Sequence, residues 1–386
     1  MLVKPRAGQP AKIKVVGVGG GGGNALSSMI DDGGISGVEF VVVNTDAQAL
    51  LHHKAETKIQ IGDNLTKGLG SGGDPDVGRQ AAEESKERLT DELSGADMVF
   101  ITCGEGGGTG TGASPIVAEV ARETGALTVA VVTKPFDFEG SKRKFVAGDG
   151  IERLKEKVDT LIVVPNQRIL QVIDKKTPIL EAFRRIDSVL HQGVKGIAEL
   201  ITIPGLVNVD FADVKTIMAG AGTALMGVGT GSGDKRAIAA IKQAISSPLL
   251  DVSIEGARGV LFNVVGGADL TMNEIDEAAS IIAKTVDPDA DIIFGAVIDD
   301  KMVDQIKVTL IATKFDEGKL RLFRFRKDSE EDVLTQKESE EDQDEIIEKE
   351  KPMKTSMREE LLEDVVEEGL AEEESEFDIP AFLRKK

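Results

Sequence analysis

The sequence contains one cysteine, three histidines, and neither tryptophan nor tyrosine in 386 residues. A single cysteine, Cys103, excludes an internal disulfide and fits a reducing compartment. With so few histidine and cysteine side chains available, no metal site is assigned from the sequence. No run of about 18 apolar residues occurs, and residues 1–12 lack the apolar centre of a signal peptide. We therefore expect a cytoplasmic protein with no direct insertion into a membrane.

Basic residues are outnumbered by acidic ones, and the net charge at pH 7 is −21. A chain with this charge repels nucleic acid, so we expect no nucleic-acid partner. Most of the excess lies in residues 328–376, which contain 22 acidic and five basic residues. Because a highly charged segment with few aromatic residues cannot bury enough surface to fold, we predict a disordered acidic linker there. Residues 317–327, in which basic and apolar residues alternate, are a possible extra strand before it.

Short apolar runs alternate with helical patterns through the first half of the chain. Runs that are apolar at every position indicate strands buried on both faces, as in a parallel sheet flanked by helices. We therefore predict a doubly wound α/β domain at residues 12–178, after a flexible N terminus at residues 1–11. Its predicted strands are Ile13–Val18, Phe40–Val43, Met98–Thr102, Val129–Thr133 and Leu161–Val164, and its predicted helices include Gly78–Leu93 and Ser114–Thr124.

A long helical pattern, Ile179–Thr202, separates this domain from a second one. The pattern ends at Pro204 and Gly205, because proline has no N–H to donate and glycine readily leaves the helical conformation. We predict a central helix at residues 179–203 and a second, smaller α/β domain at residues 204–316. Strands are expected there at 225–229, 259–265, 292–297 and 306–313, and helices at 235–245 and 272–284.

A first glycine run, Gly17 to Gly23 followed by Asn24, lies between a predicted strand and a helix. At such a turn, backbone N–H groups and the positive end of a helix dipole can bind phosphate. The run contains the GxGxxG spacing that also occurs in NAD-dependent enzymes. Those enzymes need an acidic residue at the end of the second strand to bind a ribose hydroxyl, but Asn44 occupies that position. The NAD-dependent alternative therefore rests on this spacing alone.

A second glycine run, Gly104–Gly112, includes Thr109 and Thr111 and again follows a predicted buried strand. Consecutive glycines allow several N–H groups to converge on phosphate oxygens, and the threonines add hydroxyl donors. The chain has no GxxxxGK[ST] motif, which excludes a P-loop NTPase. Gly106–Gly112 instead resembles the phosphate-binding signature of the tubulin superfamily. Residues 11–316 and the extreme C terminus resemble the FtsZ family of bacterial cell-division GTPases within it.

The resemblance implies a site for GTP and GDP, with Mg²⁺ on the phosphates held mostly through waters. A carboxylate can accept hydrogen bonds from both guanine N1–H and the exocyclic amine, a pairing that adenine does not offer. Asp187 is therefore the expected determinant of guanine specificity, and a salt bridge from it to Arg184 or Lys195 is the alternative. By the resemblance, Glu139 and Arg143 bind the ribose, Phe183 stacks on the base, and Asn24 and Asn166 contact the base edge. The remaining implied GTP-binding residues are Gly20, Gly21, Gly22, Gly23, Asn44, Gly70, Ser71, Gly72, Gly73, Gly106, Gly107, Gly108, Thr109, Gly110, Thr111, Gly112 and Pro135.

An Asn-x-Asp-x-x-Asp segment, Asn208 to Asp213, follows the break at Pro204. From the residues alone, Asp210 with Asp213 three positions later also fits an N-cap at the start of a helix. The resemblance implies a catalytic role: Asp210 and Asp213 would polarise the water that attacks the GTP of the adjacent subunit, and Asn208 would help to position it. Hydrolysis would then depend on head-to-tail assembly into a homopolymer. A non-hydrolysing relative of the superfamily is the alternative, and the complete set of three residues argues against it.

The last ten residues, 377–386, regain apolar and basic side chains after the acidic linker. Ile379, Phe382 and Leu383 have the spacing of one helical face. Asp378 can cap such a helix, and Pro380 is tolerated in its first turn. We predict a partner-binding peptide on a tether. By the resemblance it would bind membrane-tethering division adaptors and regulators, and the filaments would form the cytokinetic ring at the division site under the membrane.

Overall fold

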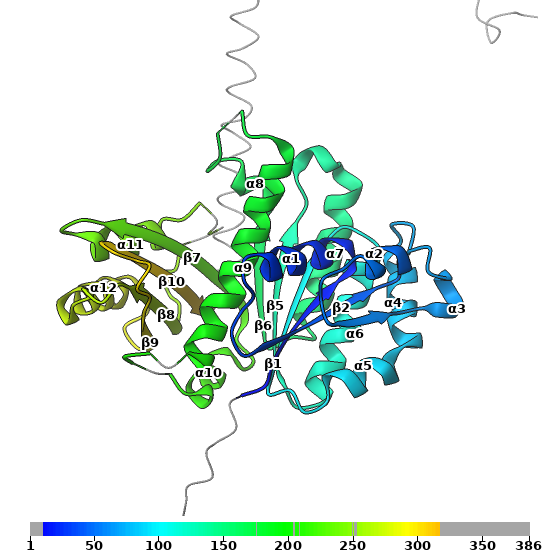
Figure 1. The fold of residues 1–386 in the computed structure, drawn as a ribbon, viewed down its shortest axis with the longest axis horizontal. Helices are drawn as coiled ribbons and strands as arrows, with labels where there is room; N and C mark the ends of the chain where they lie inside the picture. The colour runs from blue at the N-terminus through cyan, green and yellow to red at the C-terminus, as the bar shows by residue number, and fades with distance from the viewer. Residues whose placement is uncertain are drawn as a thin grey trace, which may run out of the picture. The chain divides into compact units, whose positions relative to one another are not determined.

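The computed structural model describes residues 11–316, apart from residues 175, 204, 208, 249, 251 and 252. Within this part of the chain, ten strands form one sheet in the order β3-β2-β1-β4-β5-β6-β7-β10-β8-β9 (Figure 1). The strands are β1 (Ile13–Val18), β2 (Val38–Asn44), β3 (Thr57–Gln60), β4 (Met98–Gly104), β5 (Leu127–Lys134), β6 (Thr160–Pro165), β7 (Gly222–Ser232), β8 (Gly259–Gly266), β9 (Asp291–Ile298) and β10 (Gln305–Thr313).

The half of the sheet from β3 to β6 is parallel throughout. The strand order reverses at β1: β2 and β3 lie on one side of it, and β4, β5 and β6 on the other. At the end of β1, Val18 pairs with Val43 of β2 and with Cys103 of β4. In doubly wound sheets, ligands bind beyond the carboxyl ends of the strands at such a switch point. Both glycine runs lie there, because they come at the ends of β1 and β4.

Helices cover both faces of the parallel strands (Figure 1). Because side chains alternate along a strand, Ile13 and Val15 of β1 belong to one buried core, and Val16 and Val18 belong to another. This is why the strand sequences are apolar at nearly every position. The first core includes residues of α1 (Gly19–Asp31), α9 (Ile179–Thr202) and α10 (Phe211–Met218), and the second includes residues of α4 (Pro75–Glu84), α5 (Lys86–Leu93), α6 (Thr109–Glu123) and α7 (Ser141–Lys155).

The sheet continues into the second half of the chain, where β7 pairs with β6 in parallel and with β10 antiparallel. α11 (Arg236–Ile245) and α12 (Met272–Thr285) enclose a third core on one face of these strands. The long helix α9 packs on the other face, and a Cβ on Gly193 would lie 2.8 Å from Met226 Sδ. The predicted fold class is confirmed: a long helix connects a parallel-sheet domain to a smaller α/β part.

Some elements differ from the sequence-based prediction. The predicted helix at 78–93 is two helices, α4 and α5, which meet at Ser85, whose hydroxyl accepts a hydrogen bond from Gly62 N at 3.2 Å. Helix α6 begins at Thr109, five residues before its predicted start, although its first turn is rich in glycine. α7 was not predicted, because Gly148 and Gly150 interrupt its helical pattern. Short elements lie in the connections: α2 (Ala47–Leu51), α3 (Asp63–Thr66), η1 (Asp137–Glu139) and α8 (Asn166–Ile169).

Several predictions fall on other parts of the chain. The possible strand at 317–327, the linker at 328–376, the peptide at 377–386 and nearly all of the N-terminal segment 1–11 lie outside the described residues. Among the helices that are described, none combines the length and the apolar character that crossing a bilayer requires.

Candidate nucleotide-binding site

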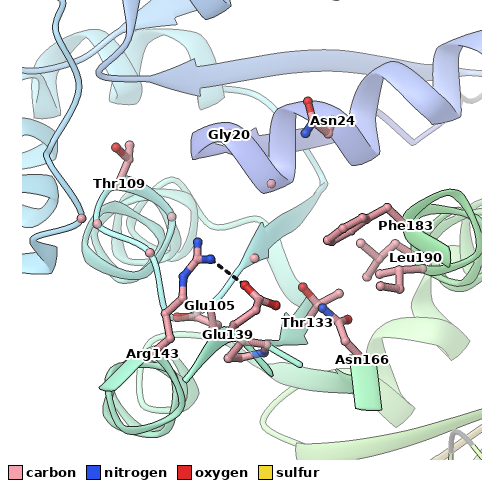
Figure 2. A pocket seen from close by; sticks show the side chains of 18 of the residues that line it. Gly20, Asn24, Glu105, Thr109, Thr133, Glu139, Arg143, Asn166, Phe183 and Leu190 are labelled. Carbon is pink, nitrogen blue, oxygen red and sulfur yellow. Dashed lines mark hydrogen bonds and ion pairs between the residues drawn. The ribbon is translucent and has the colours of Figure 1, made fainter. Parts of the chain in front are cut away.

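A cavity of about 430 Å³ opens at the carboxyl ends of the parallel strands (Figure 2). Its walls come from the start of α1, the loop at residues 70–73, the turn from β4 into α6, the segment from β5 to α7, and the region of α8 and α9. The structure thus brings together segments that are far apart in the sequence. Of the predicted GTP-binding residues, those that line the cavity are Gly20, Gly21, Asn24, Ser71, Gly73, Gly107, Gly108, Thr109, Gly110, Pro135, Glu139, Arg143, Asn166, Phe183 and Asp187.

Two helix N termini border the cavity. α1 begins at Gly19 and α6 at Thr109, and in neither does a side chain cap the first amides or an acidic residue occupy the first turn. The first amides of a helix have no intrahelical partner, and the helix dipole adds positive potential there. A Cβ on Gly20 or Gly107 would meet no atom within 4 Å, so backbone borders open space at both positions. This arrangement is suited to bind an anion such as a phosphate chain.

Other glycines hold the two helix starts together. Gly19 has a φ of 70°, and a Cβ there would lie 2.7 Å from Gly110 N, so α1 and α6 begin in backbone contact. A Cβ on Gly22 would lie 2.3 Å from a carbonyl oxygen of β4. A Cβ on Gly112 would lie 1.9 Å from Pro75 O, at the start of α4. These positions need glycine because backbone packs against them.

Eight predicted GTP-binding residues are not part of the cavity lining. Asn44 is buried, and its Oδ1 accepts a hydrogen bond from Thr45 N at 2.9 Å. Thr111 is also buried, and its hydroxyl accepts a hydrogen bond from Gly106 N at 2.9 Å, which shapes the loop. Direct contact of these eight residues with phosphate stays a prediction. The full set is Gly22, Gly23, Asn44, Gly70, Gly72, Gly106, Thr111 and Gly112.

The end of the cavity formed by α9 carries the groups predicted to recognise the base. Phe183 is 41% exposed and packs edge-on against Phe136, with 5.6 Å between the ring centroids. Asp187 accepts a hydrogen bond from Ser28 Oγ at 2.9 Å, and burial raises the pKa of its carboxyl. Asn166 is buried, and its Oδ1 has no hydrogen-bond partner among the described residues. An acceptor left open in this way fits a ligand with N–H groups, such as a guanine base.

Glu139 and Arg143 form an ion pair at the mouth of the cavity (Figure 2), with Arg143 Nη1 at 2.6 Å from Glu139 Oε2. The other oxygen of Glu139 accepts a hydrogen bond from Phe136 N at 2.9 Å. The pair is therefore anchored to the short helix η1 and to the first turn of α7. It presents both a hydrogen-bond acceptor and a cation to a bound molecule, which suits the hydroxyls of a ribose and the adjoining phosphate.

Glu105 is a buried acidic residue of the lining that the sequence-based site did not include. It is 4% exposed, and its Oε1 accepts a hydrogen bond from Cys103 Sγ at 3.2 Å. Burial raises the pKa of this carboxyl to about 7, because the loss of water outweighs the opposing hydrogen bond from Cys103. Its charge therefore changes near neutral pH, beside a site suited to anions.

The sequence-based site also missed Gly104, Thr133, Ile186 and Leu190. Ile186 and Leu190 follow Phe183 by three and seven positions, which is the spacing of one helical face. This periodicity could have identified them once Phe183 was placed at the base. Thr133 lies near the end of β5, just before Pro135, and its position follows from the parallel strand order.

The residues predicted to be catalytic lie apart from this cavity. Asp210 is the N-cap of α10, and its Oδ1 accepts a hydrogen bond from Asp213 N at 2.9 Å, so the capping interpretation is confirmed. Both side chains are exposed, and neither lines the cavity. Asp187 is on the third turn of α9, and the fifteen residues that follow it, to Thr202, extend the helix by about 22 Å before the chain reaches α10. Asn208 lies outside the described residues.

Together, the doubly wound sheet and the two uncapped helix starts define a nucleotide-binding α/β protein. Residues 12–174 match the family described as "Tubulin/FtsZ family, GTPase domain", and residues 222–316 match "FtsZ family, C-terminal domain". The chain belongs to the Tubulin/FtsZ family. It is a GTPase by this membership, which also implies that the chain binds a guanine nucleotide.

Solved structures agree with this assignment. An FtsZ dimer from M. jannaschii is 48% identical, with a TM-score of 0.76, covering 80% of this chain and 89% of that chain. A mutant FtsZ from M. jannaschii is 49% identical, with a TM-score of 0.75, covering 79% and 91%. CetZ2 from Haloferax volcanii, in a GTPγS-bound protofilament, is 20% identical with a TM-score of 0.68, covering 84% and 99%, and supports the fold alone.

The described residues contain no cluster of three or more histidine, cysteine, aspartate or glutamate side chains that could hold a metal ion. Mg²⁺ prefers octahedral oxygen ligands and commonly binds through substrate phosphates and waters, with few protein ligands.

Proposed function

We propose that this protein binds GTP in the cavity, polymerises head to tail, and hydrolyses GTP only when a neighbouring subunit completes the site. The observation that carries the proposal is the separation of Asp210 and Asp213 from the cavity of their own chain. Phosphoryl transfer depends on a positioned water and on charge stabilisation. The cavity supplies donors for phosphate, and the exposed carboxylates of α10 would supply the water-activating groups from the next subunit.

The proposed ligand is GTP with Mg²⁺. Gly20, Gly107 and Thr109 would surround the phosphates, Glu139 with Arg143 would bind the ribose, and the groups on α8 and α9 would bind guanine. The FtsZ dimer from M. jannaschii is an assembly of a relative, and it supports self-association of this chain. A head-to-tail contact is heterologous, so it generates an open filament where the rotation does not close.

The cellular role we propose is that of a division filament, which forms a cytokinetic ring beneath the membrane. The C-terminal peptide at 377–386 would connect the filament to membrane-tethering adaptors and regulators through Asp378, Ile379, Pro380, Phe382 and Leu383. The family assignment supports a role in cell division.

Phosphate release per molecule, measured with light scattering over a range of protein concentrations, tests the shared site. Turnover should rise steeply with concentration and should be lost in Asp213→Asn, which should still bind GTP. Mixing Asp213→Asn with a nucleotide-binding variant, Asp187→Ala, gives the sharper result. The Asp187→Ala subunit brings an intact Asp213 to GTP bound by its neighbour, so the mixture should show turnover that neither variant shows alone. A rate per molecule independent of concentration, together with an inactive mixture, would refute the shared-site mechanism.

A further inference from the structure

Three hydroxyl groups form a chain that ends at the phosphate side of the cavity. Thr45 Oγ1 lies 2.7 Å from Thr109 Oγ1, and Ser71 Oγ lies 3.0 Å from the same Thr109 oxygen. Thr109 and Ser71 line the cavity, whereas Thr45 follows β2 and is fully buried behind them. The three residues come from separate segments, so the chain of hydroxyls joins the end of β2, the loop at 70–73 and the start of α6.

The burial of Thr45 fixes the direction of its hydrogen bond. Among the described residues, Thr109 Oγ1 is the only hydrogen-bond partner of the Thr45 hydroxyl, and Thr45 is 0% exposed to bulk solvent. If Thr109 donated to Thr45, the proton of Thr45 would be buried without an acceptor, which is unfavourable. Thr45 therefore donates to Thr109.

The Thr109 hydroxyl can then still donate its own proton and accept one further hydrogen bond. Ser71 is only partly buried, so its hydroxyl can rotate to donate to that lone pair. With both neighbours donating, the Thr109 proton is left free to point into the cavity. Aligned hydroxyls polarise one another, so a donor at the end of such a chain is stronger than an isolated one.

The loop at 70–73 is held against α6 in a way that keeps this geometry. Gly70 N donates a hydrogen bond to Thr45 O at 3.3 Å, which ties the loop to the same threonine. A Cβ on Gly108 would lie 2.2 Å from Ser71 Oγ, so the serine hydroxyl sits directly on the backbone of the phosphate loop. The position of Ser71 is therefore set by contacts on both sides.

We propose that Thr45 and Ser71 are positioning residues that orient the Thr109 hydroxyl proton toward a phosphate oxygen of the bound nucleotide. The proposal rests on the proposed GTP site, and it assigns a role to Thr45, which does not line the cavity. It predicts an effect on the phosphate part of the ligand only. Guanosine, which has the base and ribose but no phosphate, should be insensitive to the hydroxyl chain.

The test measures dissociation constants for GDP and for guanosine by titration calorimetry on the full chain. Thr45→Val keeps the shape and removes the hydroxyl, and it should weaken GDP binding about tenfold while guanosine binding changes less than about twofold. Thr45→Ser restores the hydroxyl and should bind GDP within about threefold of the unsubstituted chain. Ser71→Ala should weaken GDP binding about threefold to tenfold. Thr90→Val, which removes a hydroxyl bonded to Lys86 O on α5, is the matched control and should change neither constant.

A double-mutant comparison shows whether the effect passes through Thr109. In a Thr109→Val background, Thr45→Val and Ser71→Ala should each change GDP binding by less than about twofold. The proposal is overturned if Thr45→Val weakens GDP and guanosine equally, if it weakens neither, or if its effect persists without the Thr109 hydroxyl. Ser71→Ala, at a partly exposed position, gives the same comparison should Thr45→Val fail to fold. If the unsubstituted chain binds no GDP, the proposed function is refuted as well. If it binds GDP but the ratio of the GDP and guanosine dissociation constants is the same in the variants, only the role of the hydroxyl chain is refuted.

Discussion

Ser28 Oγ donates a hydrogen bond to Asp187 Oδ2 at 2.9 Å, and this contact joins α1 to α9 at the base end of the cavity. It engages one oxygen of the carboxylate and fixes the side chain. Among the described residues, Asp187 pairs with neither Arg184 nor Lys195, the alternatives that the sequence left open; its side-chain partner is Ser28, and Lys195 lies 3.6 Å from Glu199. The carboxylate is thus held by a neutral donor, with acceptor capacity left for two N–H groups of a guanine base.

Asp187→Asn should therefore reduce both affinity and base selectivity. An amide cannot accept from guanine N1–H and the exocyclic amine together, so we expect GTP to bind about 10- to 100-fold more weakly. Competition between GTP and inosine triphosphate, which lacks the exocyclic amine, measures the selectivity. The preference for GTP should nearly vanish in Asp187→Asn, while Ser28→Ala, which only loosens the carboxylate, should keep it. An undiminished preference in Asp187→Asn would show that another group reads the base.

Glu105 should make the stability of the protein depend on pH around neutrality. Its carboxyl has an ordinary pKa of 4.5, and burial raises the pKa to about 7 in the folded protein. Between these values the folded state binds more protons than the unfolded state, so the free energy of unfolding falls as pH rises from about 4.5 to 7 and then levels off. A shift of this size corresponds to about 3 kcal/mol.

Glu105→Gln isolates this contribution, since the amide has a similar shape and does not titrate. Urea unfolding of both proteins at pH 5, 6, 7 and 8 gives the measurement. The stability difference between Glu105→Gln and the unsubstituted chain should grow in favour of the variant up to about pH 7 and stay constant above it. If the free energies of unfolding of the two proteins change in parallel with pH across this range, the carboxyl of Glu105 is neutral or charged throughout.

Much of the parallel sheet could be predicted because its strands are buried on both faces and therefore read as unbroken apolar runs. The central helix was predicted at 179–203, within one residue of the 24-residue helix α9, because its apolar positions repeat with a helical period. The short strand β3, whose sequence TKIQ carries only one apolar residue, offers no such signal. Its position depends on pairing with β2, which is a tertiary contact.

The glycine runs located the site, but they could not show which glycines face a ligand and which pack against backbone. A Cβ on Gly20 would enter open space, whereas a Cβ on Gly22 would clash with the backbone of β4, so only Gly22 is required by packing within the protein. Sequence alone does not distinguish a glycine that faces a ligand from one that packs against backbone. The burial of Glu105 was equally hidden, because it depends on the approach of α7, where a Cβ on Gly150 would lie 2.6 Å from Glu105 Oε2.

Asp210 and Asp213 should have separable effects on stability. Asp210 caps α10, so Asp210→Ala should lower the free energy of unfolding by about 1 kcal/mol. The Asp213 side chain is exposed, so Asp213→Asn should change stability by less than about 0.5 kcal/mol. Both variants should lose GTP turnover at concentrations where the unsubstituted chain assembles. Urea unfolding and phosphate-release assays on the same variants make the comparison. If Asp213→Asn retains GTP turnover, the two aspartates have no role beyond capping the helix.

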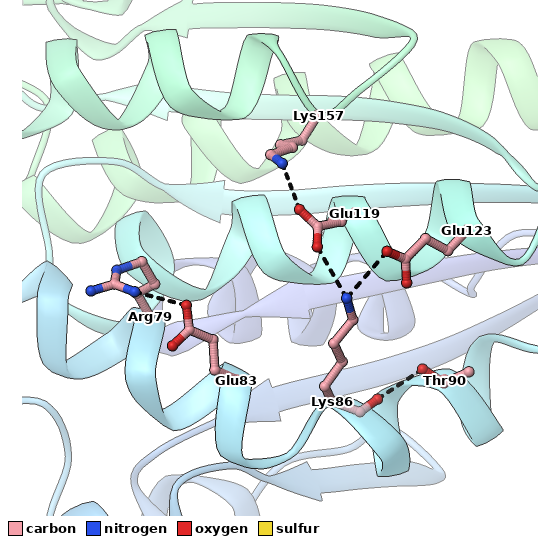
Figure 3. Close-up of polar contacts among 7 residues, drawn as sticks. All are labelled: Arg79, Glu83, Lys86, Thr90, Glu119, Glu123 and Lys157. Atoms are coloured by element: carbon pink, nitrogen blue, oxygen red, sulfur yellow. Dashed lines mark hydrogen bonds and ion pairs between the residues drawn. The ribbon is translucent and has the colours of Figure 1, made fainter.

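Glu119 on α6 links three segments, because it pairs with Lys86 at the start of α5 and with Lys157 just after the end of α7 (Figure 3). Its two oxygens lie 3.0 Å from Lys86 Nζ and 2.5 Å from Lys157 Nζ, and these hydrogen bonds, with that of Lys157 the strongest, lower the pKa of the carboxyl. Glu119→Gln should lower stability by about 1 kcal/mol at low salt and by less in 1 M NaCl. The contribution should be present above the ordinary pKa of the carboxyl and be lost on acidification through its lowered value.

The pair Arg79 and Glu83 on α4 provides the control for this network (Figure 3). It is an i,i+4 ion pair within one helix, where Arg79 also lies 3.7 Å from Asp76, so Glu83→Gln should lower stability by only about 0.3 kcal/mol. Thermal unfolding at two salt concentrations measures both variants. Equal effects of the two substitutions would show that connecting three segments adds nothing beyond single surface pairs.

Two glycines in helices should respond oppositely to alanine. A Cβ on Gly112 would lie 1.9 Å from Pro75 O, so Gly112→Ala must push α4 away from α6 and should lower the free energy of unfolding by about 3 kcal/mol. A Cβ on Gly148, an exposed position of α7, would meet nothing within 4 Å, so Gly148→Ala should raise stability by about 0.5–1 kcal/mol through helix propensity. Urea unfolding compares the two.

Because α6 begins at the phosphate side of the cavity, Gly112→Ala should also weaken GDP binding, whereas Gly148→Ala should not. A stabilising Gly112→Ala would mean that the two helices are not in backbone contact.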